Sequence, residues 1–128
     1  MTPLSLDEFD AIREAVQKCV PDLPHQIADI TGFSLYWDES MVKSGTLGAY
    51  HWYFPADLRI STVGKHALDL IVPVVCHELR HAWQHQTMGV AYLAKANRLW
   101  ARWTIEPSAY EVERAAEKIL GQEQGVGI

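Results

Sequence analysis

The chain has 128 residues, which predicts a single domain over residues 1–128 and excludes a second large core. Its 48% hydrophobic and 21% charged content is typical of a soluble globular protein, and no window reaches the roughly 18 apolar residues of a membrane span. The formal net charge of −5 argues against a nucleic-acid partner. Residues 1–8 lack the basic and apolar regions of a secretory signal, so we expect a cytoplasmic protein with no membrane partner.

The first part of the chain predicts one helix followed by a strand. Ser5 and Glu8 have the spacing of a capping box, and an apolar stripe continues the helix until Pro21 ends it. Residues 22–31 predict a short second helix, and residues 33–37 predict a strand.

The middle of the chain predicts two further strands and a long helix. A polar loop over residues 39–48 leads to an aromatic strand over residues 50–54, and residues 58–61 form a last short strand. Ser61 or Thr62 is expected to cap the long helix, which ends near Gly89. Pro73 predicts a kink or break in this helix, at about residues 69–72.

Two C-terminal helices complete an α+β fold with one N-terminal helix and a small sheet that has antiparallel edges. The first covers residues 90–100, and the second has Pro107 in its first turn and ends near Gly121. The tryptophans at helical spacing, Trp83, Trp100 and Trp103, are expected in the core. Cys19 and Cys76 occupy apolar helical positions where buried thiols are expected, and the sequence leaves a disulfide between them open.

The long helix contains the sequence His77-Glu78-Leu79-Arg80-His81, the H-E-x-x-H arrangement of zinc hydrolases. Residues four apart lie on one helix face, so His77 and His81 can bind one metal ion. Glu78 lies about 100° round the helix, where it can reach a metal-bound water without being a ligand. The preceding residues 68–76 are almost wholly apolar, which predicts a buried helix in which these polar groups need a partner. We therefore expect bound Zn²⁺.

A hydrolytic zinc site needs a third protein ligand, and four downstream side chains are candidates. They are His85, Glu106, Glu111 and Glu113. His85 continues the register of the motif, but three residues over two turns of one straight helix cannot all converge on one ion. His85 is therefore expected at the surface or in a pocket wall. Cys76 points away from the face of the two histidines and is not counted as a ligand.

The segment VVCHELRHAWQHQ, residues 74–86, resembles the active-site helix of zincin metallopeptidases. It is especially similar to small metallopeptidase-like proteins of bacteria and their phages. In the gluzincin-like branch a later helix supplies a glutamate ligand in an E-x-x-A-D or E-x-x-A-Y pattern, and the segment EPSAY, residues 106–110, matches the second form. The resemblance covers residues 74–120 and implies a minimal zincin-like fold. It implies Glu106 as the third ligand, with Glu111 and Glu113 as alternatives that lack the alanine.

The resemblance also implies peptide-bond hydrolysis with Glu78 as the general base. Where the common pattern has an aspartate that holds a zinc-bound histidine, this chain has Tyr110, so the orientation of that histidine can depend on another group. The oxyanion of the reaction needs a second donor besides the metal. The sequence does not choose among four candidates for it, Tyr110, Tyr92, Arg80 and His85.

By the same resemblance, a peptide or protein substrate lies along an edge strand within residues 50–54 or 58–61. Two other functions stay open: a catalytically silent zincin-like module for metal binding or interaction, and a zinc hydrolase of non-peptide or cell-wall amides. The intact Glu78 favours an enzyme, because a module released from catalysis has no need of a base at this position.

Overall fold

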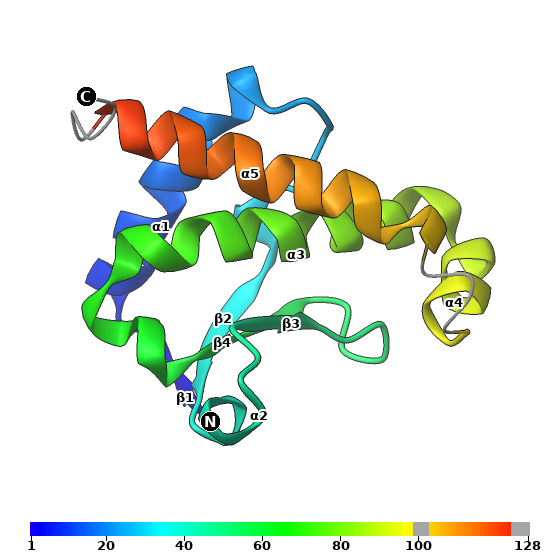
Figure 1. The fold of residues 1–128 in the computed structure, drawn as a ribbon. Helices are drawn as coiled ribbons and strands as arrows, with labels where there is room; N and C mark the ends of the chain where they lie inside the picture. Colours follow the sequence, from blue (N-terminus) through cyan, green and yellow to red (C-terminus); the bar gives the residue numbers. More distant parts are fainter. Residues whose placement is uncertain (99–102, 124–128) are drawn as a thin grey trace.

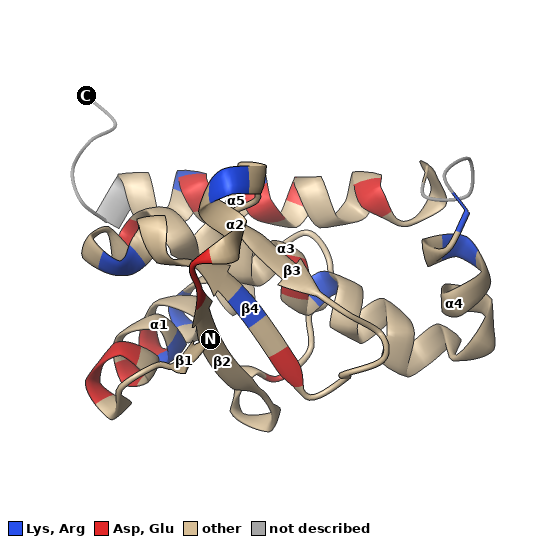
Figure 2. Ribbon diagram, turned by 90° about the horizontal axis from the view of Figure 1, so that it is seen from below, with Lys and Arg blue, Asp and Glu red and all other residues tan. Residues whose placement is uncertain are grey.

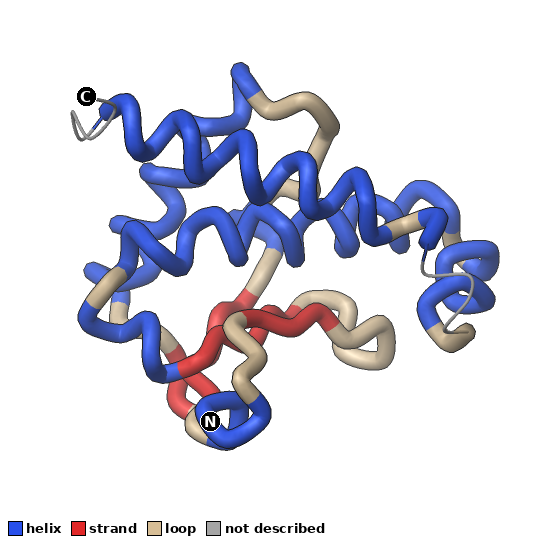
Figure 3. Tube along the Cα trace, viewed as in Figure 1, coloured by secondary structure: helices blue, strands red, loops and turns tan. Residues whose placement is uncertain are grey.

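The fold places a layer of helices against one face of a small sheet (Figures 1 and 3). The computed structural model describes residues 1–98 and 103–123. The longer elements are α1 (Leu6–Cys19), β2 (Ser34–Asp38), β4 (Asp57–Ser61), α3 (Leu68–Met88) and α5 (Glu106–Glu123). The shorter ones are β1 (Thr2–Pro3), α2 (Ser40–Ser44), β3 (Gly48–Tyr50), α4 (Val90–Ala96) and 3₁₀ turns at Val20–Asp22, Ile30–Gly32 and Thr62–His66. This mixture of helix and sheet confirms the α+β prediction.

Helix α1 begins at the predicted capping box. The Ser5 hydroxyl accepts a hydrogen bond from the backbone N–H of Glu8 at 3.1 Å, and the Glu8 carboxylate accepts one from the N–H of Ser5 at 2.9 Å. Glu8 also accepts a hydrogen bond from the indole of Trp37 at 3.2 Å. The cap therefore joins α1 to β2.

The predicted helix over residues 22–31 is wrong. Proline disfavours a helical conformation in the residue before it, and Leu23, before Pro24, is extended with a ψ of 139°. The Asp29 side chain accepts a hydrogen bond from the N–H of Thr31 at 3.0 Å and starts a separate turn. The N–H of Ala28 donates to the carbonyl of Leu79 at 3.0 Å, so this loop is held against the motif in α3.

The sheet has the order β1-β2-β4-β3 and is antiparallel only at its edges. The antiparallel edges agree with the prediction, whereas the central pair, β2 and β4, is parallel. The reason is that the chain passes through α2 and β3 between these strands, so no hairpin joins them. One face of the central pair is buried under the helices, and its side chains include Leu35, Trp37, Leu58 and Ile60.

The predicted aromatic strand over residues 50–54 is also wrong. β3 ends at Tyr50, and the chain then turns back, with hydrogen bonds from Phe54 N–H to His51 C=O (2.9 Å) and from Asp57 N–H to Phe54 C=O (3.0 Å). Tyr50 pairs with Leu58, and β4 begins only one residue earlier. Residues after His51 therefore have no strand to pair with.

Helix α3 begins later than predicted and runs without a break. Ser61 caps the 3₁₀ turn Thr62–His66 by accepting from the N–H of Val63 at 3.3 Å, and α3 starts at Leu68. The helix continues through Pro73, which has no backbone N–H to donate in the second turn. Gly89 ends it with a φ of 56°, as predicted.

Helix α3 packs along α5 on one side and on the sheet on the other (Figure 1). Cys19 and Cys76 are buried thiols within this core, and burial raises the pKa of Cys76. Trp83 is partly buried against the core as predicted, whereas Trp103 is 80% exposed and Trp100 lies outside the described residues. Within the described ranges, no helix has both the length and the apolar character needed to cross a membrane.

The C-terminal helices agree only partly with the prediction. α4 is shorter than residues 90–100, although residues 99–100 lie outside the described part of the chain. α5 starts one residue before Pro107 and continues to Glu123. The start of α5 faces the motif in α3 and therefore positions the site.

Candidate metal centre

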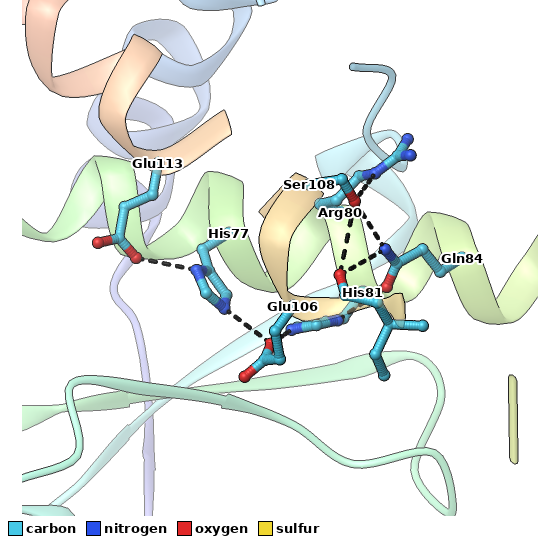
Figure 4. Close-up of polar contacts among 8 residues, drawn as sticks. His77, Arg80, His81, Gln84, Glu106, Ser108 and Glu113 are labelled. Carbon is cyan, nitrogen blue, oxygen red and sulfur yellow. Dashed lines mark hydrogen bonds and ion pairs between the residues drawn. The ribbon is translucent and has the colours of Figure 1, made fainter. Parts of the chain in front are cut away.

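Three predicted ligands converge between α3 and α5 (Figure 4). His77 and His81 lie on one face of α3, and Glu106 is the first residue of α5. Nε2 of His77 lies 3.5 Å from Oε1 of Glu106, and Nε2 of His81 contacts the same oxygen. One ligand atom from each residue lies within 4.8 Å of the other two. Both histidines are buried, whereas Glu106 is partly exposed.

The buried side chain of Gln84 fixes the ring of His81. Its Nε2 donates to the carbonyl of Ile105 at 2.9 Å and to the hydroxyl of Ser108 at 3.0 Å. Its Oε1 is therefore the atom that accepts from Nδ1 of His81, at 2.9 Å. His81 thus has its proton on Nδ1 and directs the lone pair of Nε2 toward Glu106.

The carboxylate of Glu113 lies behind His77. Its Oε1 is 3.0 Å from Nδ1 of His77, although the two are out of line for a hydrogen bond. Glu113 follows Glu106 by two helical turns, so both project from the same face of α5. Tyr110, between them, packs edge-on against His77 with ring centroids 4.7 Å apart. Glu113 therefore lies outside the triad, beside the ring of His77. It is a carboxylate near a histidine of the motif, where the sequence has Tyr110 in place of the usual aspartate.

The triad has the donor set of a cation site. With protons on both Nδ1 atoms, two imidazole lone pairs and a carboxylate oxygen face one another, and all three are acceptors. Among the described residues, the buried Oε1 of Glu106 has no hydrogen-bond donor. A tetrahedral zinc site with bonds of about 2.0–2.1 Å separates its donors by about 3.3 Å. The 3.5 Å between His77 Nε2 and Glu106 Oε1 is close to that value. These residues fit a divalent metal ion.

The electrostatics of the triad also favour positive charge at this point. Burial alone lowers the pKa of His77, but the carboxylates of Glu106 and Glu113 outweigh it and raise the pKa to about 9. In turn, His77 and His81 hold the pKa of Glu106 well below its usual range. In the absence of a metal, a proton on His77 balances the carboxylates.

Glu78 lies beside the triad and is held by the edge strand β3. Burial raises the pKa of its carboxyl, against the opposing effect of the two histidines, and the backbone N–H of Tyr50 donates to it. The close approach of β3 depends on Gly48, where a Cβ would lie 2.5 Å from Cγ1 of Val74 and 3.3 Å from Cγ of Glu78. Glu78 is thus placed next to the metal ligands without joining them.

A cavity of about 470 Å³ opens beside the triad and Glu78. β3, the turn after it, α4 and the start of α5 contribute to its wall. Residues 44–56 include no Asp, Glu, Lys or Arg, and Figure 2 shows the β3–β4 turn without any of these residues. In this turn Trp52, Tyr53 and Phe54 are exposed, and the Tyr53 ring packs edge-on against the other two. The turn therefore presents an uncharged aromatic surface beside the cavity.

His85, Tyr92 and Tyr50 form an aromatic cluster at this cavity. The Tyr50 hydroxyl lies 2.5 Å from Nδ1 of His85. Tyr92 stacks on His85 with centroids 5.2 Å apart, and it lies 6.4 Å from the rings of both Tyr50 and His81. Tyr50 and Tyr92 line the cavity, and His85 contacts both of them. His85 is therefore a supporting residue and does not belong to the triad.

Arg80 and Glu111 are not brought to the triad. The Arg80 guanidinium donates to the carbonyl of Gln26 at 2.7 Å and to the hydroxyl of Ser108 at 3.2 Å, and it lies over the Trp83 ring. Glu111 pairs with His25 at 2.6 Å. Arg80 therefore connects α3 to α5 and to the loop before β2, and Glu111 connects α5 to the same loop.

No protein-family model matches the chain, and no curated protein and no solved structure is significantly similar to it. What the site can do therefore depends on its own residues and geometry.

Sequence reasoning missed two of the supporting roles. Gln84 follows His81 by three residues and Glu113 follows Glu106 by seven, so helical spacing places each on the same face as a ligand. These spacings are signals that could have been used. The bond between Tyr50 and His85 has no such signal, because it depends on how β3 lies across α3.

Proposed function

We propose that this chain is a zinc-dependent peptidase of the zincin type with Glu106 as the third ligand. The observation that carries the proposal is the convergence of His77, His81 and Glu106 beside Glu78. Bound zinc supplies a Lewis acid that polarises a carbonyl and lowers the pKa of a water. Gln84 orients the imidazole of His81 by a hydrogen bond, and the carboxylate of Glu113 lies behind the imidazole of His77.

Glu78 acts as the general base in this proposal. It takes a proton from the attacking water and delivers it to the leaving amine. Its raised pKa supports that role, because a carboxylate with a higher pKa accepts a proton more readily. The amide of Tyr50 keeps the carboxylate turned toward the cavity.

The edge of β3 is suited to bind an extended peptide. The Leu47 carbonyl accepts from Ser61 N–H at 3.0 Å, so, by the alternation of an antiparallel ladder, Ala49 also bonds to β4. Gly48 and Tyr50 then direct their backbone groups away from β4, where the N–H of Tyr50 donates to Glu78. A substrate strand can pair with the backbone groups of Gly48 and with the carbonyl of Tyr50, and the aromatic β3–β4 turn adds uncharged contact surface. We therefore expect β3, rather than residues 58–61, to hold the substrate.

The metal half of the proposal is tested by zinc content. Purified wild-type protein should contain about one zinc per chain, and His77→Ala should contain almost none. Glu106→Ala should lose zinc, whereas Glu111→Ala, the matched control at the His25 pair, should retain it. Equal trace zinc in wild type and His77→Ala would contradict a metal site.

The peptidase half is tested with an unbiased peptide library. Zinc-loaded wild type should cleave peptides, and Glu78→Gln should keep its zinc but lose cleavage. A zinc-loaded protein that cleaves no peptide points instead to a silent module. Cleavage of cell-wall amides alone points to the non-peptide hydrolase.

A further inference from the structure

Tyr50 is the residue through which the edge strand contacts both Glu78 and the end of the motif helix. Its backbone N–H donates to the Glu78 carboxylate, and its hydroxyl lies 2.5 Å from Nδ1 of His85, two turns further along α3 than His77. Tyr50 also lines the cavity beside the triad. No other described residue makes both contacts.

Amide hydrolysis places negative charge on the carbonyl oxygen of the substrate, and this oxygen needs a hydrogen-bond donor besides the metal. Three of the sequence-based candidates are poorly placed. The Arg80 guanidinium is engaged with Gln26 and Ser108. Tyr110 packs on the ring of His77 and is not part of the cavity wall described above. Nδ1 of His85 is occupied by Tyr50.

Tyr92, the fourth candidate, is 4% exposed, and its ring packs against three other rings. Tyr92 is therefore suited to hold the neighbouring rings in place by packing. Both tyrosines line the cavity, but Tyr50 is only partly buried, so it is the more accessible of the two to a bound substrate.

The contact with His85 leaves the hydroxyl proton of Tyr50 free to donate to a substrate when His85 is in one of its two neutral tautomers. A phenol has one proton and can also accept a hydrogen bond. When His85 is neutral with its proton on Nδ1, it donates to the phenol oxygen, and the phenol proton is directed elsewhere. Stacking on Tyr92 holds the His85 ring in the orientation this requires.

We propose that the Tyr50 hydroxyl, positioned by His85, donates a hydrogen bond to the carbonyl oxygen of the substrate as negative charge develops there. The proposal rests on the proposed peptidase function. Tyr50 is the catalytic residue in it and His85 the positioning residue, and no proton is transferred. Burial raises the pKa of Tyr50 to about 12, so the phenol keeps its proton at neutral pH.

The kinetic test uses a peptide cleaved by the wild-type enzyme. Removing one oxyanion donor costs about 100- to 1000-fold in kcat, so Tyr50→Phe should lose that much with KM nearly unchanged. Tyr36→Phe, at a tyrosine of β2, is the matched control and should retain full activity. His85→Gln should lower kcat by less than Tyr50→Phe, because it misplaces the donor without removing it. A His85→Gln defect in KM alone would overturn the positioning role.

A second test does not depend on turnover. In the metal-free protein, the ring ¹⁵N resonances of His85, assigned by comparison with His85→Gln, should show the proton on Nδ1. In Tyr50→Phe the proton should shift toward Nε2, because the acceptor is gone. A wild-type His85 with its proton on Nε2 would overturn the proposal, since Tyr50 would then be donating to the imidazole.

The outcomes separate this proposal from the peptidase proposal. If wild type cleaves peptides and Tyr50→Phe cleaves them equally well, only the role of Tyr50 is overturned. If zinc-loaded wild type cleaves no peptide, the peptidase proposal fails and the role of Tyr50 fails with it, whatever the ¹⁵N resonances show.

Discussion

At the scale of single residues, the two histidines of the triad are oriented by different chemistry. His81 donates to a neutral amide that also bonds the start of α5, whereas His77 faces a carboxylate. A carboxylate behind an imidazole ligand raises its basicity and strengthens metal binding. In the proposed zinc site, Glu113 would therefore raise the metal affinity without touching the ion.

We predict that Glu113→Gln weakens zinc binding by about 10- to 100-fold, the usual effect of losing such an outer partner. Competition with a chromophoric chelator measures the affinity. Glu111→Gln is the matched control, because it changes the same residue type two positions away on the same helix, and it should bind zinc like wild type. Equal affinities for both variants would show that the Glu113 charge does not act on His77.

A second prediction concerns the cap of α1. The N–H of Ser5, followed by the indole of Trp37, lowers the pKa of Glu8 despite some burial. A carboxyl with a lowered native pKa stabilises the fold above the unfolded value of about 4.3 and loses that contribution as the pH falls through the native pKa. The unfolding free energy of wild type should therefore exceed that of Glu8→Gln at pH 7, and the difference should shrink toward pH 3. Urea denaturation measures both free energies. An unchanged difference between the two variants from pH 7 to pH 3 would refute the prediction.

At the scale of elements, the separation between β3 and α3 is set by one missing side chain. A Cβ at Gly48 would overlap Val74, and it would also press on Glu78. We predict that Gly48→Ala lowers the unfolding free energy by roughly 1–3 kcal/mol, the usual cost of overpacking, as measured by urea denaturation.

The matched control for Gly48→Ala is Gly32→Ala, where a Cβ meets nothing within 4 Å. It should leave stability almost unchanged. Val74→Ala should reduce the cost of Gly48→Ala, because it removes the closest atom. Additive effects in the Gly48/Val74 double variant would show that the clash is not the cause.

How far the sequence predicts these elements depends on how local their determinants are. The capping box of α1 and the glycine that ends α3 are local, and both predictions are confirmed. Strand β3 is not local, because its length depends on where β4 begins, so aromatic propensity alone overextends it to Phe54. The parallel pairing of β2 and β4 and the contact between Tyr50 and His85 also need the tertiary arrangement.

At the scale of the molecule, the triad joins two helices that are far apart in the chain. His77 and His81 come from α3, and Glu106 comes from the start of α5. A ligand that binds only the folded state stabilises it by about 2.7 kcal/mol at 100 times its dissociation constant. We predict that zinc raises the melting temperature of the chelator-treated wild type, measured by calorimetry. His77→Ala should show no such rise, and an equal rise in both would indicate binding elsewhere.

The two positions that the motif leaves unspecified are as constrained as the three that it names. Leu79 is fully buried, and its carbonyl accepts the amide of Ala28. Arg80 connects three segments of the chain. Grafting only His77, Glu78 and His81 onto another helix would therefore transfer these side chains without the contacts that orient them. In a saturation mutagenesis scan, Leu79 and Arg80 should tolerate few substitutions, each for a reason unrelated to the metal.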